Sequence, residues 1–162
     1  MSTSKLFQPV KVGDLTLAHR IVLAPLTRFR GTAEHVHTDL GVEHYRQRGS
    51  TPGTLLITEG TFIAAKAGGY PHVPSIETDE QLVAWKKVCF SNFRPHSNFL
   101  THRLQITDAV HEQKSFIFAQ LWALGRTANP DALKAEGFEL VGPSDIPAAG
   151  KTKPRPLTTD GV

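Results

Sequence analysis

Polar and aromatic residues at the ends of three apolar runs in this chain suit the binding of a flat, hydrogen-bonding ligand. Thr27 follows the first run, Gly60 stands near the end of the second, and Gln120 and Trp122 stand in the third. An amide both donates and accepts hydrogen bonds, a hydroxyl does the same on a smaller scale, and a glycine permits close backbone approach. Together these groups fit a heteroaromatic ring with mixed donors and acceptors along its edges.

The three apolar runs are expected to form parallel strands. They cover residues 21–24, 54–60 and 115–122. The first is a short continuous apolar run typical of a parallel strand covered on both faces, although a buried helix segment has the same pattern. Pro25 argues against ladder pairing after the first run, because proline has no N–H to donate. Parallel neighbours would bring the polar strand ends to one face of the sheet, where such folds bind ligands. Taken singly, each residue also fits an ordinary turn, loop, strand end or core position.

Helical patterns separate the apolar runs. Asp39 is expected to cap a helix that ends at Gly49, and Asp79 is expected to open another helix with acidic residues in its first turn. Residues 10–17 alternate around a Gly-Asp pair and predict a small hairpin ahead of the first strand. The order strand, helix, strand, helix, strand indicates βαβ units, so the predicted fold class is α/β with a parallel sheet.

Composition and charge exclude several kinds of partner. The 162 residues carry 18 Lys plus Arg against 15 Asp plus Glu, and the basic residues are scattered, which argues against nucleic acid or a membrane surface as partner. Cys89 stands alone, and no clustered Cys/His spacing, including that of His35 and His37, suggests a metal site. The N-terminus lacks the apolar core of a signal peptide, and no run is long enough to span a bilayer. We expect a soluble, cytoplasmic protein without a metal; the sequence leaves its oligomeric state open.

Three longer segments carry a family resemblance. They read "LFQPVKVGDLTLAHRIVLAPLTRFR", "YRQRGSTPGTLLITEGTFIAAKAGGY" and "SFIFAQLWALGR". The chain resembles the N-terminal part of the old yellow enzymes, the FMN-dependent ene-reductases, and especially their fungal members. The resemblance implies the first part of a (β/α)₈ TIM barrel, about three βα units preceded by a β-hairpin. It also implies FMN at the carboxyl-end face, NAD(P)H as reductant, and hydride transfer to an activated alkene such as an enone.

The resemblance also implies roles for single residues. The residues expected to contact the flavin are Pro25, Leu26, Thr27, Gly60 and Gln120. The Thr27 hydroxyl is expected to bond the flavin O4 region and to tune the reduced ring, which makes it the catalytic residue of the set. Gly60 would let its strand approach the isoalloxazine, Gln120 would bond the pyrimidine edge, and Trp122 would wall the substrate side. Other branches of the family have cysteine at the position of Thr27, so the threonine favours the fungal and yeast-like branch.

The chain departs from the family pattern in its length. A complete barrel of this type needs about 250 residues, so a single domain of 162 residues is a partial barrel. The resemblance assigns several functional groups to the missing remainder: the His/Asn or His/His pair that anchors the substrate oxygen, a tyrosine proton donor, and the basic residues that hold the flavin phosphate. Two functions stay open: an FMN-dependent oxidoreductase seen here as a truncated N-terminal part, or a catalytically silent product with residual ligand or partner binding.

Residues 88–105 are a second departure, because they have no counterpart in the family pattern. A helix running from Asp79 to Lys114 through this segment would be about 54 Å long and would contain Pro95. The segment keeps the reading frame, begins with a residue whose codons start GT, and ends with one that has a codon ending AG. We interpret it as an insertion resembling a retained intron; a tolerated surface loop is the alternative.

Removing the insertion restores one helical pattern. Residues 79–87 then continue into residues 106–113, and four apolar residues lie on one stripe: Leu82, Trp85, Ile106 and Val110. We therefore expect both flanking segments to be helical and the insertion itself to be irregular.

Overall fold

A computed structural model describes residues 4–85 and 106–158 of the chain. Its centre is a parallel sheet of three strands in the order β3–β4–β5. The strands are β3 (Val22–Leu23), β4 (Leu55–Phe62) and β5 (Phe116–Trp122). The α/β class and the parallel arrangement predicted from the sequence are confirmed.

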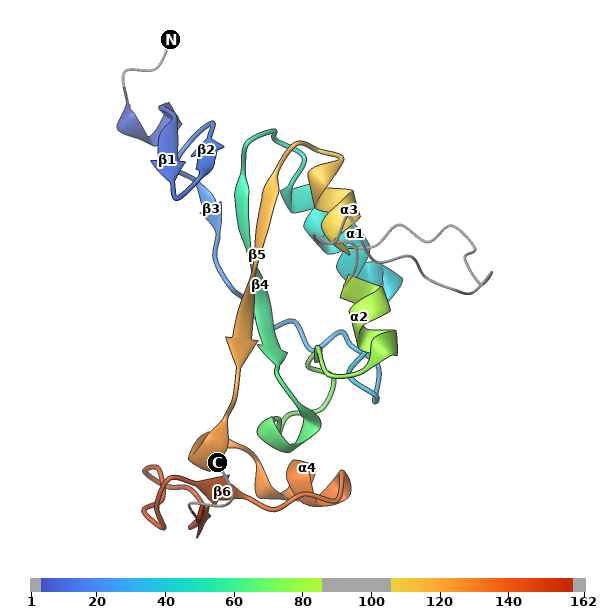
Figure 1. Ribbon diagram of the computed structural model, residues 1–162, viewed down its shortest axis with the longest axis vertical. Helices are drawn as coiled ribbons and strands as arrows, with labels where there is room; N and C mark the ends of the chain where they lie inside the picture. Colours follow the sequence, from blue (N-terminus) through green and yellow to red (C-terminus); the bar gives the residue numbers. More distant parts are fainter. Residues whose placement is uncertain (1–3, 86–105, 159–162) are drawn as a thin grey trace.

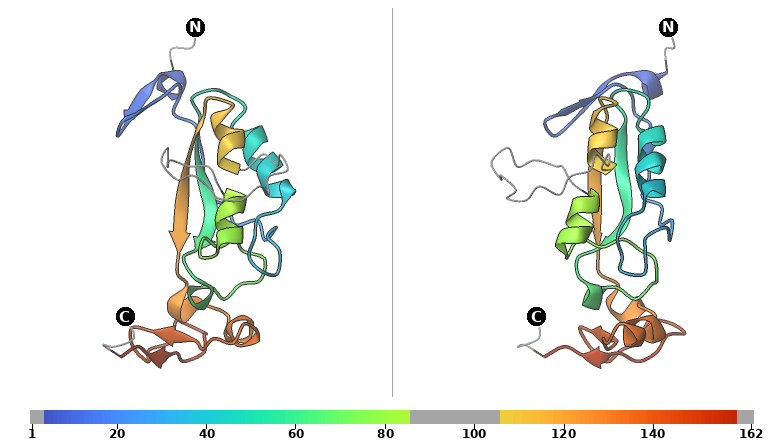
Figure 2. Two further views of the ribbon diagram at one scale, coloured as in Figure 1. Left: turned by 45° about the vertical axis from the view of Figure 1, so that its right-hand side comes forward. Right: turned by 90° about the vertical axis from the view of Figure 1, so that its right-hand side faces the viewer.

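Three helices lie on one side of this sheet (Figures 1 and 2). They are α1 (Asp39–Arg48), α2 (Asp79–Trp85) and α3 (Ile106–His111). The N-cap of α1 is Thr38 rather than the predicted Asp39, which instead lies in the first turn where its charge favours the helix dipole. The helix ends at Gly49 as predicted.

The two ends of the sheet carry different extensions (Figure 1). The predicted hairpin, β1 (Val10–Val12) and β2 (Leu15–Leu17), is antiparallel and lies near the end where the strands begin. At the carboxyl ends of the strands lie α4 (Pro130–Ala135) and a short parallel pair, β6 (Val141–Gly142) and β7 (Arg155–Pro156). The sequence analysis did not predict this second extension.

The prediction that the first strand is covered on both faces is wrong for the described part of the chain, and the third strand is open on one face as well. Ile21 and Val22 are 47% and 39% exposed, and Phe118 of β5 is 49% exposed. The reason is geometric: the helices cover one face only, and β3 and β5 are the edges of the described sheet. The described residues, 4–85 and 106–158, form no closed barrel.

The core under the helices confirms most of the predicted stripe. Trp85, Ile106 and Val110 are buried together with Tyr45 and Leu56. Leu82, the fourth member of the predicted stripe, is 37% exposed and is not part of this core.

Helices α2 and α3 are held end to end across a long stretch of sequence. The Thr107 hydroxyl donates to the Trp85 carbonyl at 2.9 Å. Subtracting the eighteen residues of the predicted insertion places Thr107 four positions after Trp85, which is the hydrogen-bond spacing of an α-helix. The α3 helix ends at His111, two residues before the predicted limit. Residues 86 and 87 and the insertion lie outside the described residues, so its predicted irregularity stays a prediction.

Two classes of feature are absent from residues 4–85 and 106–158. No helix among them combines the length and apolar character needed to cross a bilayer. No group of three or more His, Cys, Asp or Glu side chains gathers there as a possible metal site.

Candidate functional site

The carboxyl ends of β4 and β5 bring three of the predicted site residues together. Gly60 is the register partner of Gln120, and Phe62 is the partner of Trp122. Gln120 and Trp122 are two positions apart on β5, so their side chains point to the same face of the sheet. The rings of Trp122 and Phe62 lie 5.7 Å apart at their centroids, which fixes the tryptophan at the strand end.

Gly60 has a structural role that the sequence did not indicate. A Cβ atom at this position would lie 2.3 Å from Cε3 of Trp122, closer than any real contact. The glycine is therefore required by the tryptophan ring that crosses it. Its predicted close approach to a flavin stays a prediction.

The loop that follows β3 is fixed to the end of β4 by one buried carboxylate. The backbone N–H of Arg28 donates to Oε2 of Glu59 at 2.9 Å. Thr27, the residue before Arg28, is half-buried, whereas Leu26 is 54% exposed. The contact places the loop of Pro25, Leu26 and Thr27 beside the strand end that carries Gly60.

The site offers unused hydrogen-bonding groups to a ligand. Within the described part of the chain, neither the Thr27 hydroxyl nor the side-chain amide of Gln120 has a hydrogen-bond partner, and Gln120 is exposed. A hydroxyl and an amide can between them donate to and accept from the edge of a ring such as isoalloxazine. The donor set of these residues therefore fits the flavin ring of FMN.

Beneath the strand ends, two titratable side chains are buried next to each other on the helix side of the sheet. Nε2 of His37 lies 4.0 Å from Oε1 of Glu59, and both ring nitrogens of His37 lack a hydrogen-bond partner within the described residues. Burial, with a smaller contribution from the charge of His44, lowers the pKa of His37 to about 3. Burial raises the pKa of Glu59, against the opposing effects of the Arg28 N–H and the Arg28 charge. His37 is therefore neutral at pH 7.

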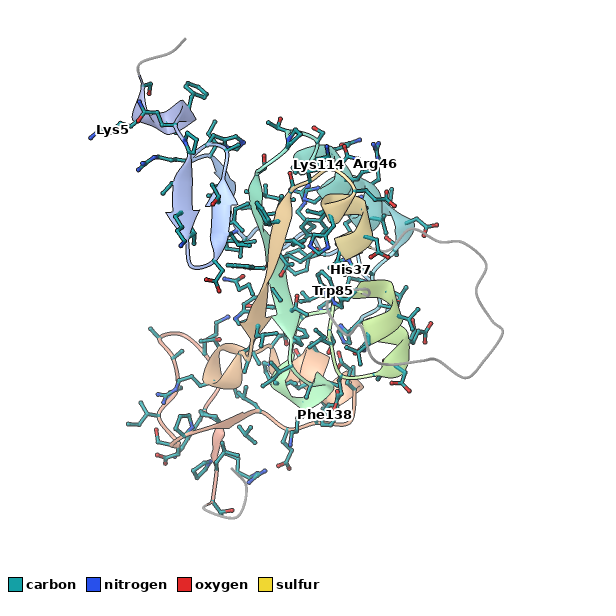
Figure 3. The ribbon with its side chains drawn as sticks, turned by 45° about the horizontal axis from the view of Figure 1, so that its top comes forward. Lys5, His37, Arg46, Trp85, Lys114 and Phe138 are labelled. Carbon is teal, nitrogen blue, oxygen red and sulfur yellow. The ribbon has the colours of Figure 1, made fainter. Side chains whose placement is uncertain are left out.

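The surroundings of His37 show that this pair belongs to the core. Its ring lies 4.1 Å from that of Trp85 in an edge-on arrangement, and Figure 3 shows the two labelled side chains next to each other. The sequence analysis considered His37 only as a possible metal ligand, which its spacing from His35 did not support, and did not anticipate its burial.

Two hollows of the surface lie away from the predicted flavin residues. One, of about 600 Å³, is lined by α4 and the segments around β6 and β7. The other, of about 300 Å³, lies between α1 and the loop after β3 and includes Arg28 and Glu59 among its lining residues. Neither includes Thr27, Gly60, Gln120 or Trp122.

Sequence analysis missed two residues that act at the strand ends, Tyr45 and Thr58. The Tyr45 hydroxyl accepts a hydrogen bond from the Glu59 N–H at 2.8 Å, and the Thr58 hydroxyl accepts one from the Gln120 N–H at 2.9 Å. The signal for Thr58 was a hydroxyl directly after the three apolar residues that begin β4. No local signal identified Tyr45, because its partner is fourteen residues away.

Fold and site together define a class: an α/β protein with parallel strands and polar and aromatic side chains gathered at the strand ends, where such folds bind ligands. Within that class, the chain belongs to the NADH:flavin oxidoreductase / NADH oxidase family, whose model matches residues 5–91. The resemblance to the old yellow enzymes is confirmed. Membership implies FMN as the cofactor and NAD(P)H as the reductant.

Two curated fungal proteins and one solved structure illustrate what the chain is similar to. The chain is 46% identical over 98% of its length to "NADP-dependent oxidoreductase lnbE" of Aspergillus flavus, and covers 38% of that protein. It is 43% identical over its whole length to "Probable inactive reductase easA" of Epichloe festucae var. lolii, again covering 38%. Among solved structures, the old yellow enzyme from Pichia sp. AKU4542 matches 89% of the chain with 40% identity and a TM-score of 0.75. The chain covers 33% of that structure.

Proposed function

We propose that the whole protein is an FMN-dependent NAD(P)H oxidoreductase of the old yellow enzyme type that reduces activated alkenes such as enones. Within it, Thr27 bonds the flavin O4 region, Gln120 bonds the pyrimidine edge, and Trp122 walls the substrate side. Pro25, Leu26 and Gly60 complete the surface against which the ring lies. Small molecules are the substrates, and the cytoplasm is the proposed location.

One observation supports this proposal most strongly: Gly60 and Gln120 are paired in register where two parallel strands end. The Trp122 ring crosses Gly60 at the same point, so a flat apolar surface and an unpartnered amide adjoin each other. The Arg28–Glu59 hydrogen bond attaches the Thr27 loop to the same strand end. A ring bound there would meet an amide from β5 and a hydroxyl from the loop.

The chemistry follows from this placement. FMN, when bound, supplies hydride acceptance from NAD(P)H and hydride donation to the alkene. The Thr27 hydroxyl, as a fixed dipole at the ring edge, tunes the electron density of the reduced ring. The neutral Gln120 amide orients the ring without adding charge. Trp122 excludes water from one side of the substrate space.

A catalytically silent product is the second candidate, and the open sheet face supports it. Val22 and Phe118 are exposed on the face that carries Gln120 and Trp122, and the chain spans 38% of the curated relatives described above. One of those relatives is itself named an inactive reductase. In this case, only weak ligand or partner binding remains.

A chimera tests the first candidate. Residues 1–162 without residues 88–105 are joined to the remaining part of the Pichia old yellow enzyme, and FMN binding is read from the visible spectrum. We expect stoichiometric flavin, reduction by NADPH, and reoxidation by a simple cyclic enone under anaerobic conditions. The Thr27→Ala variant should change the flavin potential or the rate of a half-reaction by the equivalent of about 1–3 kcal/mol, because one hydrogen bond to the ring is lost. A folded chimera that holds no flavin contradicts the proposal.

The 162-residue chain by itself tests whether FMN binding requires the remaining part of the barrel. We expect no stoichiometric FMN binding at micromolar concentration in a flavin-fluorescence titration, because Thr27, Gly60 and Gln120 contact only the ring. In barrels of this type, loops after later strands hold the phosphate. Stoichiometric yellow protein would show that the remaining barrel is not required for the cofactor.

A further inference from the structure

Strand β4 contains a bulge at the level of the predicted site. Ile57 is the register partner of Phe118, but the next pairing is Gly60 with Gln120. Two residues of β4, Thr58 and Glu59, therefore stand opposite one residue of β5. Because side chains alternate along a strand, one extra residue moves every later side chain of β4 to the opposite face.

The bulge decides which residue of β4 faces the predicted flavin. In an unbroken register, Glu59 would be the partner of Gln120 and would share its face, while Gly60 would point toward the helices. In the observed register, Gly60 shares the face of Gln120. The Glu59 carboxylate instead lies on the helix side, 4.0 Å from His37.

Four hydrogen bonds with side-chain hydroxyls satisfy the backbone at the bulge: two hydroxyls accept from N–H groups, and two donate to a carbonyl. The Glu59 N–H donates to the Tyr45 hydroxyl at 2.8 Å, and the Gln120 N–H donates to the Thr58 hydroxyl at 2.9 Å. The Glu59 carbonyl accepts from the hydroxyls of Thr58 and Thr61 at 2.8 and 3.0 Å. Tyr45, Thr58 and Thr61 are at most 2% exposed. A buried backbone group that loses such a partner is strongly disfavoured, so these hydroxyls hold the bulge in place.

We propose that Thr58 and Tyr45 are positioning residues whose hydroxyls hold this bulge and so turn Gly60, rather than the Glu59 carboxylate, to the face of Gln120 and Trp122. The reference to a flavin at this face rests on the proposed function. The chemical consequence is that the ring edge meets a neutral amide and a glycine. A carboxylate at the same place would repel the negative charge that builds up on a ligand ring during reduction.

Amide hydrogen exchange and chemical shifts of the flavin-free 162-residue chain test this proposal. Thr58→Val removes the hydroxyl with little change of shape, Thr58→Ser retains a hydroxyl, and Tyr45→Phe removes the phenol oxygen only. Thr107→Val is the matched control, because it removes another buried hydroxyl bond, to the Trp85 carbonyl, away from the bulge.

We expect Thr58→Val to speed exchange of the Gln120 amide by at least about tenfold relative to the control, and Tyr45→Phe to do the same for Glu59. The Gly60 protons, which lie next to the Trp122 ring, should shift in both variants. Thr58→Ser should restore the wild-type signals. A Thr58→Val chain that unfolds while the Ser variant and the control stay folded gives the same support.

Wild-type exchange at Gln120 and Glu59, with unshifted Gly60 protons in both hydroxyl-deleted variants, would overturn the proposal. These measurements need no flavin. A failure of the flavin titration and a failure of the positioning role can therefore be told apart.

Discussion

The two faces of the β3–β4–β5 sheet differ in what they bury and in what they offer to a ligand. The helix-covered face is a packed core in which Tyr45, Trp85 and Val110 are almost inaccessible. The opposite face leaves Val22 and Phe118 exposed and carries Gln120 and Trp122. Stability in the described chain therefore depends on one face, whereas the predicted chemistry belongs to the other.

The most direct way to test this division is a pair of matched truncations. Trp85→Ala should lower the free energy of unfolding by about 3–5 kcal/mol, because it leaves a cavity and removes the indole hydrogen bond to the Ser75 carbonyl. Phe118→Ala, at a side chain 49% exposed, should cost less than about 1 kcal/mol. Urea unfolding followed by circular dichroism measures both. Equal losses would show that the open face is covered in solution.

A substitution at Gly60 tests the contact between Gly60 and the Trp122 ring, which is the packed part of the open face. Gly60→Ala places a Cβ atom against the Trp122 ring and should cost about 1–3 kcal/mol through overpacking. Tryptophan fluorescence and near-ultraviolet circular dichroism should change along with the unfolding midpoint. Gly13→Ala is a control without any steric neighbour, although its positive φ adds a backbone penalty of its own. A Gly60→Ala protein with unchanged tryptophan signals contradicts the contact.

Deletion of residues 88–105 tests whether α2 and α3 can join into one helix on the covered face. The Thr107–Trp85 hydrogen bond already has helical spacing once these residues are subtracted. We expect the shortened chain to be more stable by about 1–2 kcal/mol, because the entropy of closing a long loop is no longer lost. Far-ultraviolet circular dichroism should show added helix. A less stable chain would argue that the segment belongs to the fold.

A further test concerns pH and His37 on the covered face. Its pKa of about 3 in the folded chain lies below the unfolded value near 6.5, so the unfolded state binds more protons between these values. Stability is fully present well above pH 6.5 and should fall as the pH drops from 6.5 to about 3, at a rate that approaches about 1.4 kcal/mol per pH unit. The raised pKa of Glu59 acts in the opposite direction near its own titration.

The His37→Leu variant separates the two contributions to this pH dependence. The difference in unfolding free energy between wild type and variant, measured by urea titration from pH 7 to pH 4.5, isolates the histidine. An identical pH slope in both proteins would show that His37 is protonated without cost.

Sequence alone could predict the parallel strands, the hairpin and the pairing of site residues at one edge, because each depends on local periodicity or turn chemistry. It could not predict which face is covered, since exposure of Val22 and Phe118 depends on which other strands and helices are present. The bulge was also beyond reach: Thr58 and Tyr45 act through partners distant in sequence. The lack of room for a Cβ atom at Gly60 could also not be predicted, because it depends on where the Trp122 ring lies.

The hydrogen bond between Thr107 and Trp85 also has a practical consequence for protein engineering. It holds two points of the backbone within one helical turn although twenty-one residues separate them along the chain. Doubling a closed loop costs only about 0.6 kcal/mol. This junction is therefore a permissive place for epitope tags or reporter peptides, which could be exchanged there while the sheet and its strand ends keep their geometry.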